Sequence, residues 1–248
     1  MANTFVIVFV SVPLSIITSL LIAVALNSIK ALQKFLQTVF FLPYVTNTIA
    51  IGMVFAVIFE SNQGLVNTII TFFGGDAINW LGGSENGLLF EFASGNSTFN
   101  SQYFTSLVVL LIYIVWNSLP FKVIILLSAL QSVDRQYYQA AQIDGTSKAR
   151  TLWRITVPLL SPQIIYLMIT SFIGAWKEYS AIDAIFGTKG GINGKDNMAT
   201  EVWHIYRFIN SSMSGQMGYA AAFAVILFVI ILLFTALNRY ISNKKVHY

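Results

Sequence analysis

The feature that most constrains this chain is a set of long segments that contain no charged residue. An α-helix needs about 20 apolar residues to cross the hydrocarbon core of a bilayer. Four uncharged segments reach or nearly reach that length, and a fifth is interrupted only by Lys122. We therefore predict five transmembrane helices, at Phe5–Leu26, Phe35–Phe59, Phe104–Leu130, Leu159–Trp176 and Phe208–Asn238.

The composition agrees with a membrane protein and excludes several other classes. Charged residues make up 10% of the chain, whereas an average soluble domain carries about 25%. With 56% hydrophobic residues, we expect one all-α polytopic helical bundle that occupies residues 1–248. The chain has no cysteine, which excludes disulfides, thiolate metal sites and cysteine nucleophiles. Its two histidines are isolated in the sequence, so we predict no metal site.

The distribution of Lys and Arg between the predicted helices sets the orientation. Cytoplasmic loops of membrane proteins carry an excess of these residues. Here nine lie on one side of the membrane and three on the other. This predicts a multi-pass protein of the cell membrane, with the segment 132–158 and the C-terminus in the cytoplasm and the N-terminus and the loops 60–103 and 187–207 outside. It also explains the net charge of +4 without a nucleic-acid partner.

The segment from Asp134 to Val157 is unusually polar for this chain. Its pattern is typical of two short helices with a break at Asp144-Gly145, because glycine adopts left-handed backbone angles at little cost. Thr146 or Ser147 can cap the second helix. Such an amphipathic hairpin between two membrane helices suits docking to a cytoplasmic protein. On the pattern alone, a helix that lies on lipid headgroups is an equally good interpretation.

The same segment resembles a loop of a known family. Inner-membrane permeases of binding-protein-dependent ATP-binding-cassette (ABC) importers carry Glu-Ala-Ala, three residues, Gly, nine residues, Ile, one residue and Leu-Pro. This chain has the same spacings, with glutamine for glutamate and valine for leucine, in Gln139-Ala140-Ala141, Gly145, Ile155 and Val157-Pro158. Glutamine removes a charge but keeps the capacity to hydrogen-bond. The resemblance implies docking to an ATPase through Gln139, Ala140, Ala141, Asp144, Gly145, Ile155 and Pro158.

The resemblance covers nearly the whole chain and is closest to the sugar-uptake branch, the maltose and glycerol-phosphate type permeases. It is carried by the stretches FLPYVTNTIAIGMVF, WNSLPFKVIILLSALQSVDRQYYQAAQIDG and GQMGYAAAFAVIL. Permeases of this branch usually have at least one further helix before the point at which this sequence begins. The resemblance therefore leads us to expect that an N-terminal helix is absent here.

What the resemblance implies is a type I importer permease that performs no chemistry and is not an enzyme. Its expected partners are a second permease subunit in a hetero-dimer, a cytoplasmic ATPase dimer, an extracytoplasmic solute-binding protein and membrane lipid. ATP and Mg²⁺ are expected on the ATPase, with no cofactor in this chain. ATP binding would move the loops and turn the pathway outward, and the expected solute is a sugar or a sugar-like molecule.

Polar and aromatic residues at membrane depth are candidates for the solute pathway, because sugars are held by hydrogen bonds and aromatic faces. Such residues also form interfacial aromatic belts and hydrogen bonds between helices. Lys122 either lines the pathway or extends its ammonium group toward the headgroups. The candidates are Tyr44, Asn47, Tyr113, Trp116, Asn117, Trp176, Glu178 and Tyr179.

Two other classes of function stay open at this point. An intramembrane enzyme would need paired catalytic groups at matching depth, and the predicted spans contain no such pair. A stand-alone channel or secondary transporter often contains internal repeats, and none is visible. Among importers, the rival solutes are polyamines, amino acids and phosphate esters such as glycerol phosphate. The near absence of acidic residues in the spans argues against a polyamine.

Overall fold

The regular structure of this protein is helical wherever the chain is described, so the predicted all-α fold class is confirmed. Lys189 and Lys195, together with parts of the two predicted external loops, lie outside the described residues. The computed structural model describes residues 1–29, 33–81, 101–187, 190–191, 197–210 and 216–245.

Three helices in the described ranges are long and apolar enough to cross a membrane: α1 (Ala2–Ser28), α6 (Ser101–Ser132) and α13 (Gln216–Lys245). A fourth candidate is α10 (Ser161–Trp176) taken together with the helical stretch before it, from which it is bent by 70°. These helices account for the first, third, fourth and last predicted spans.

The second predicted span is not one continuous helix, which corrects the expectation for residues 35–59. It is divided into α2 (Gln33–Val45) and α3 (Thr48–Ile58). Asn47 separates them, because its side-chain oxygen accepts hydrogen bonds from the N–H groups of Ile49 at 2.9 Å and Ala50 at 3.3 Å. An asparagine in this position begins a new helix, and α3 alone, with 11 residues, is too short to cross a bilayer.

The last span also begins later than predicted. Phe208 belongs to the separate helix α12 (Glu201–Ile209), which is capped at its start by the Thr200 side chain. The side chains of Glu201 and Trp203 are buried, so this short helix packs against the protein. An uncharged run alone could not separate the end of α12 from the start of α13.

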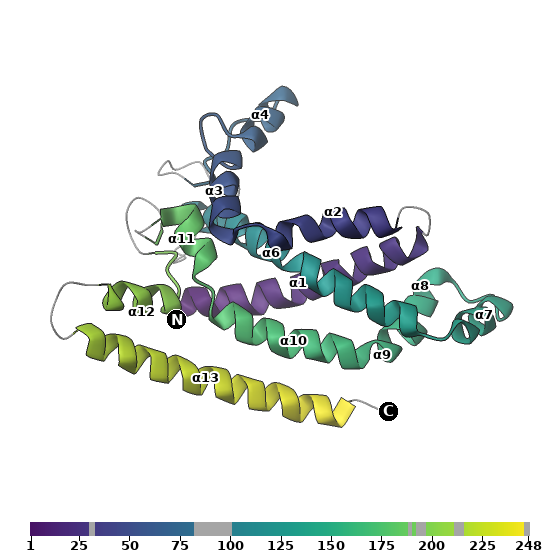
Figure 1. Cartoon of the computed structure of the whole chain (residues 1–248). Coiled ribbons are helices and arrows are strands. Elements are labelled where there is room, and N and C mark those ends of the chain that lie inside the picture. The colour runs from purple at the N-terminus through teal and green to yellow at the C-terminus, as the bar shows by residue number, and fades with distance from the viewer. Residues whose placement is uncertain (30–32, 82–100, 188–189, 192–196, 211–215, 246–248) are drawn as a thin grey trace. The chain divides into compact units, whose positions relative to one another are not determined.

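The chain divides into two compact units, each built from segments far apart in the sequence. The first contains residues 1–11, 46–115 and 174–231. Its core joins the start of α1, the first half of α6, α11 (Ser180–Phe186) and α12, through Ile7, Leu107, Leu110, Tyr113, Ile182 and Trp203. Helix α3 lies directly beside α11 in this unit (Figure 1).

A single asparagine organises the part of the first unit that follows α3. Asn67 lies on α4 (Leu65–Phe72) and is 3% exposed. Its amide donates to the carbonyls of Ser61 and Ile78 at 2.8 and 2.7 Å. It accepts from the N–H of Ile78 at 3.1 Å and from the Trp80 indole at 3.0 Å. All four hydrogen-bonding positions of this amide are thereby used, so the beginning of the predicted external loop is folded.

The second unit contains residues 12–45, 116–173 and 232–248. Its core is formed by the second halves of α1 and α6 together with α10, and α2 packs against it through Leu36 and Phe40. On α1, Ser15, Ser19 and Ala23 are buried at intervals of four residues. Small residues at this spacing allow two membrane helices to approach closely. The polar segment that carries the family-like motif emerges from this unit.

Candidate coupling loop and solute-pathway residues

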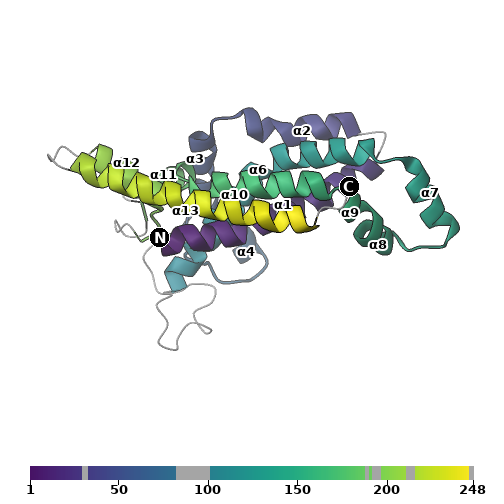
Figure 2. The same ribbon diagram turned by 90° about the horizontal axis from the view of Figure 1, so that it is seen from below.

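The predicted cytoplasmic segment is a pair of short helical stretches joined by a tight turn (Figure 2). The first helix, α7 (Arg135–Ile143), is capped by Asp134, whose carboxylate accepts from the N–H of Gln136 at 3.0 Å. The second stretch begins with α8 (Lys148–Thr151), which is capped by Ser147. Ser147 is one of the two caps that the sequence predicts.

The turn between these stretches depends on Gly145, which has φ +65°. Its N–H donates to the carbonyl of Gln142 at 3.1 Å. The N–H of Thr146 donates to the carbonyl of Ala141 at 2.9 Å. These two bonds form the Schellman motif, which ends a helix at a residue in the left-handed region. The structure therefore contains the predicted break at Asp144-Gly145, and it gives the motif glycine a conformational reason.

The motif residues differ in exposure, and the difference defines an outer side of the loop. Ala141 is 5% exposed and faces inward, and Ile155 is half-buried. The side chains or backbones available to a partner belong to Gln139, Ala140, Asp144, Gly145 and Pro158. Gln139 is exposed to solvent. Glutamine in place of the glutamate of the family motif therefore does not remove an ionic partner from the interior of this chain.

Two apolar side chains that the motif does not include are also exposed on this loop. Ile143 is 87% exposed and Trp153 is 63% exposed. Burying a side chain of this kind stabilises a complex by about 1.5–3 kcal/mol. Both residues are candidates for contact with a partner. The motif does not identify them, because it records fixed residue types and these two positions lie between its members.

Three solute-pathway candidates are packed inside the first unit. The Tyr113 hydroxyl donates to the carbonyl of Thr48 at 2.6 Å, and this side chain is 1% exposed. Trp176 is fully buried, with its ring against the edge of Phe5 at 4.8 Å between centroids. The Glu178 carboxylate accepts from the N–H of Ala181 at 2.9 Å. In this conformation these side chains hold the protein together.

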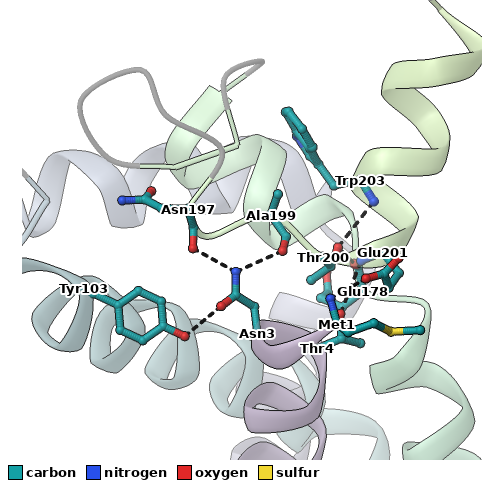
Figure 3. Close-up of polar contacts among 10 residues, drawn as sticks. All are labelled: Met1, Asn3, Thr4, Tyr103, Glu178, Asn197, Ala199, Thr200, Glu201 and Trp203. Atoms are coloured by element: carbon teal, nitrogen blue, oxygen red, sulfur yellow. Dashed lines mark hydrogen bonds and ion pairs between the residues drawn. The ribbon is translucent and has the colours of Figure 1, made fainter. Parts of the chain in front are cut away.

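Glu178 also contributes to a polar network that fixes the segment before α12 (Figure 3). Its carbonyl accepts from the Thr200 hydroxyl at 2.6 Å. Asn3 of α1 donates to the carbonyls of Asn197 and Ala199 at 2.8 and 3.0 Å and accepts from the Tyr103 hydroxyl at 2.8 Å. The start of α1 is thus bonded both to the turn before α12 and to the start of α6.

Burial also perturbs the ionisation of Glu178, which lies beyond the end of α10. Burial raises the pKa of its carboxyl group, while hydrogen bonds from the backbone N–H groups of Ala181 and Tyr179 oppose the shift. The carboxyl group serves as a hydrogen-bond acceptor for the start of α11.

The remaining candidates are less enclosed. Tyr179 contacts the Tyr206 ring at 4.7 Å between centroids, and Asn47 caps α3. In the second unit, Tyr44 is 52% exposed and stacks on Phe121 at 6.0 Å. Trp116 and Asn117 are half-buried there. The eight candidates are divided between the two units, and their role in solute binding stays a prediction.

Lys122 adopts neither of the two arrangements considered from the sequence. Its side chain is 6% exposed and its ammonium donates to the hydroxyls of Ser15 and Ser118. Ser15 is free to accept, because its own hydrogen is donated to the carbonyl of Val12 at 2.9 Å. Among the described residues no carboxylate forms an ion pair with Lys122. The charge is held between α1 and α6 by hydroxyl groups.

This arrangement predicts strong coupling between Ser15 and Lys122. The variant Ser15→Ala leaves the buried ammonium short of an acceptor and should lower the free energy of unfolding by about 1–2 kcal/mol. Lys122→Met removes the charge at similar volume and should be nearly neutral. In the Lys122→Met background, Ser15→Ala should cost less than about 0.5 kcal/mol. Thermal unfolding of the four purified chains measures this cycle, and equal costs of Ser15→Ala in both backgrounds would contradict it.

Taken together, the long apolar helices and the polar helical segment between α6 and α10 are those of a multi-pass membrane protein. The chain belongs to the family described as the binding-protein-dependent transport system inner membrane component, which matches residues 11–247. The match to the family model thus covers almost the entire chain, including the Gly145 turn.

Relatives with assigned names agree with this family. A probable ABC transporter permease protein of Mycoplasma genitalium is 32% identical over 92% of this chain, and the chain spans 63% of the length of that relative. The trehalose/maltose transport system permease protein of Thermococcus litoralis is 31% identical over 94% of this chain and 71% of its own length. The lactose transport system permease protein of Rhizobium radiobacter is 28% identical over 98% of this chain and 75% of its own length.

The fold also matches a solved structure. A chain in the crystal structure of a bacterial ABC transporter involved in the import of the acidic polysaccharide alginate superposes with a TM-score of 0.75. The match covers 98% of this chain and 78% of that chain, at 18% sequence identity. The expected ABC importer permease fold is therefore confirmed.

Proposed function

We propose that this protein is a permease subunit of an ATP-driven importer and forms part of the pathway for a sugar or sugar-like solute. The observation that carries the proposal is the family motif placed on an exposed, capped turn around Gly145. A segment that docks to a moving partner needs a defined shape, and the caps and the Schellman motif supply it. Family membership favours this docking role over a helix that rests on lipid.

The solute class rests on the relatives. Two of the relatives named above carry the names of transport systems for trehalose/maltose and lactose, and another relative is named for polygalacturonan and rhamnogalacturonan. These solutes share the dense hydroxyl groups and the apolar ring faces of sugars. Exposed aromatic rings such as Tyr44 suit that chemistry. A phosphate ester is the second candidate, and a polyamine is disfavoured by the lack of acidic residues in the spans.

In the proposed assembly this chain pairs with a second permease subunit in a hetero-dimer, and each loop 132–158 enters a groove of a cytoplasmic ATPase dimer. ATP and Mg²⁺ bind to the ATPase, and this chain performs no chemistry. An extracytoplasmic binding protein delivers the solute. Closure of the ATPase dimer moves the loops and opens the pathway outward, and hydrolysis resets it. The C-terminus lies in the cytoplasm and the N-terminus outside, as the Lys and Arg distribution predicts.

Co-purification and reconstitution test this proposal. The chain is expressed with the second permease subunit and the ATPase of its host, purified in mild detergent and placed in proteoliposomes with the binding protein. We expect the ATPase to be retained and maltose, lactose or galacturonate oligomers to enter only with ATP. Uptake by the lone chain without ATP would favour a channel or secondary transporter. Absence of ATPase retention would contradict the importer proposal.

A further inference from the structure

A side-chain hydrogen bond connects the two stretches of the loop. The Tyr138 hydroxyl lies 3.3 Å from the Thr156 hydroxyl oxygen, across 18 residues of sequence. Thr156 donates its own hydrogen to the carbonyl of Thr151 at 3.4 Å. Tyr138 is therefore the donor in the first bond, because the Thr156 hydroxyl has only one hydrogen.

Thr156 lies in an unusual piece of backbone. Residues Leu152–Thr156 form a π-helical turn, η1, between α8 and α9 (Val157–Leu159). In this turn the N–H of Val157 donates to the carbonyl of Leu152, five residues back. Pro158 follows directly, and its ring would clash with a carbonyl four residues earlier in an ordinary α-helix. A single π-turn accommodates that ring, and such turns often occur at functional sites.

Burial distinguishes this contact from the docking side of the loop. Thr156 is 4% exposed and Tyr138 is half-buried. Gln139, the next residue after Tyr138, is exposed. Adjacent residues of α7 thus have different surroundings, since one is available to a partner and the other is bonded to the stretch that leads into α10.

The Tyr138–Thr156 hydrogen bond provides a second connection between α7 and the stretch that leads into α10. The covalent route from α7 to α10 passes through the Gly145 turn, and glycine allows large changes of backbone angle. If the turn were the whole connection, a displacement of α7 large enough to break the two Schellman bonds would be absorbed there. The Tyr138–Thr156 bond bypasses the turn and ties α7 to η1, whose last residue also bonds through its carbonyl to the N–H of Leu160 at 3.0 Å.

We propose that Tyr138 is a positioning residue for energy coupling: its hydroxyl bond to Thr156 passes movement of α7 to α10 and prevents its loss at the Gly145 turn. The proposal rests on the proposed importer function. In this role Tyr138 need not touch the ATPase or the solute. Removal of its hydroxyl group should therefore lower the amount of sugar transported per ATP hydrolysed and leave the assembly of the complex intact.

The test uses the complete complex in proteoliposomes, with the number of sugar molecules taken up per ATP hydrolysed as the readout. Tyr138→Phe keeps the ring and removes the hydroxyl, and it should lower this ratio by about threefold to tenfold, the range expected from one hydrogen bond. ATPase retention should be unchanged. Thr156→Val should give the same loss and Thr156→Ser should not. Combining Tyr138→Phe with Thr156→Val should add no further loss.

Tyr137→Phe is the matched control, because Tyr137 precedes Tyr138 on α7 and is 53% exposed. It should transport as the native chain does. If the native complex transports sugar at the expense of ATP and Tyr138→Phe has the same ratio of sugar to ATP, the proposed role of Tyr138 is wrong. The importer function would not be affected by that result. Loss of ATPase retention in Tyr138→Phe would also overturn it, because the residue would then support docking. A native chain that retains no ATPase would overturn both this role and the importer function.

Discussion

The variant Gly145→Val is expected to retain at most about a tenth of the ATPase that the native chain retains. Gly145 has φ +65°, a conformation that costs a β-branched residue about 1–3 kcal/mol. A Cβ at this position would meet no atom within 4 Å apart from those of its neighbours along the chain. The expected effect therefore comes from the backbone conformation rather than from a clash of the added Cβ. Relief of the strain breaks the Schellman bonds and changes the direction in which α7 leaves the turn.

The measurement is the amount of ATPase that co-elutes with each permease variant in mild detergent. Gly145→Asn is the discriminating control, because asparagine tolerates the left-handed region and should keep most of the binding. Gly174→Ala, in α10 and also in open space, should behave as the native chain does. If asparagine and valine cause the same loss, the glycine is required for close approach of the ATPase. If neither causes a loss, the turn does not position the loop.

The part of the candidate site that could be predicted is the part governed by local chemistry. A helix that ends at Asp144-Gly145 and another that starts after Ser147 follow from residues within a few positions of each break. Glycine in the left-handed region and a serine cap act through their own backbone neighbours. The motif and the turn therefore agree without any knowledge of the rest of the fold.

The division of the second span could not be predicted from hydropathy. Residues 35–59 contain no charge. The mean hydropathy of such a run carries no information on the hydrogen bonds of a single side chain. Asn47 is a solute-pathway candidate because it is a polar residue in an apolar run. Its oxygen also bonds to the first N–H groups of α3, a structural role that the hydropathy pattern does not indicate. Both roles require the same residue type, so the sequence alone does not reveal the cap.

The same limit applies to residues whose roles depend on distant partners. Tyr113 and Trp176 are candidates as aromatic residues at membrane depth, and the structure buries both side chains in the first unit. No local pattern in the sequence indicates the Tyr138–Thr156 bond, because it joins two helical stretches across the turn. A sequence identifies which side chains can form such contacts, and the packing of helices selects among them.

The variant Gly52→Ala should produce the largest loss of stability predicted for this chain. Gly52 is buried where α3 packs on α11, and an added Cβ would lie 2.3 Å from the Cβ of Ala184. Two carbon atoms in contact need about 3.5–4.0 Å, so the helices must separate by more than 1 Å. Separation would also strain the bond from Tyr113 to Thr48. We expect thermal unfolding to report a loss of about 3 kcal/mol.

A second substitution on the facing helix decides whether this close approach is the cause. Ala184→Gly removes the atom that the new Cβ would strike, and the nearest remaining atoms are the Ala184 Cα at 3.5 Å and a Tyr113 ring carbon at 3.6 Å. The double variant Gly52→Ala/Ala184→Gly should therefore recover about 2 kcal/mol of the loss. Gly218→Ala, a helical glycine of α13 with no atom within 4 Å, should unfold at or slightly above the native temperature. If Gly52→Ala were as stable as the native chain, or if Ala184→Gly gave no recovery, α3 and α11 would not be packed at this distance. If stability is lost in Gly52→Ala and recovered in the double variant, the close contact between Gly52 and Ala184 holds α3 against α11. This contact then fixes α3 in the first unit, although α3 is not continuous with α2.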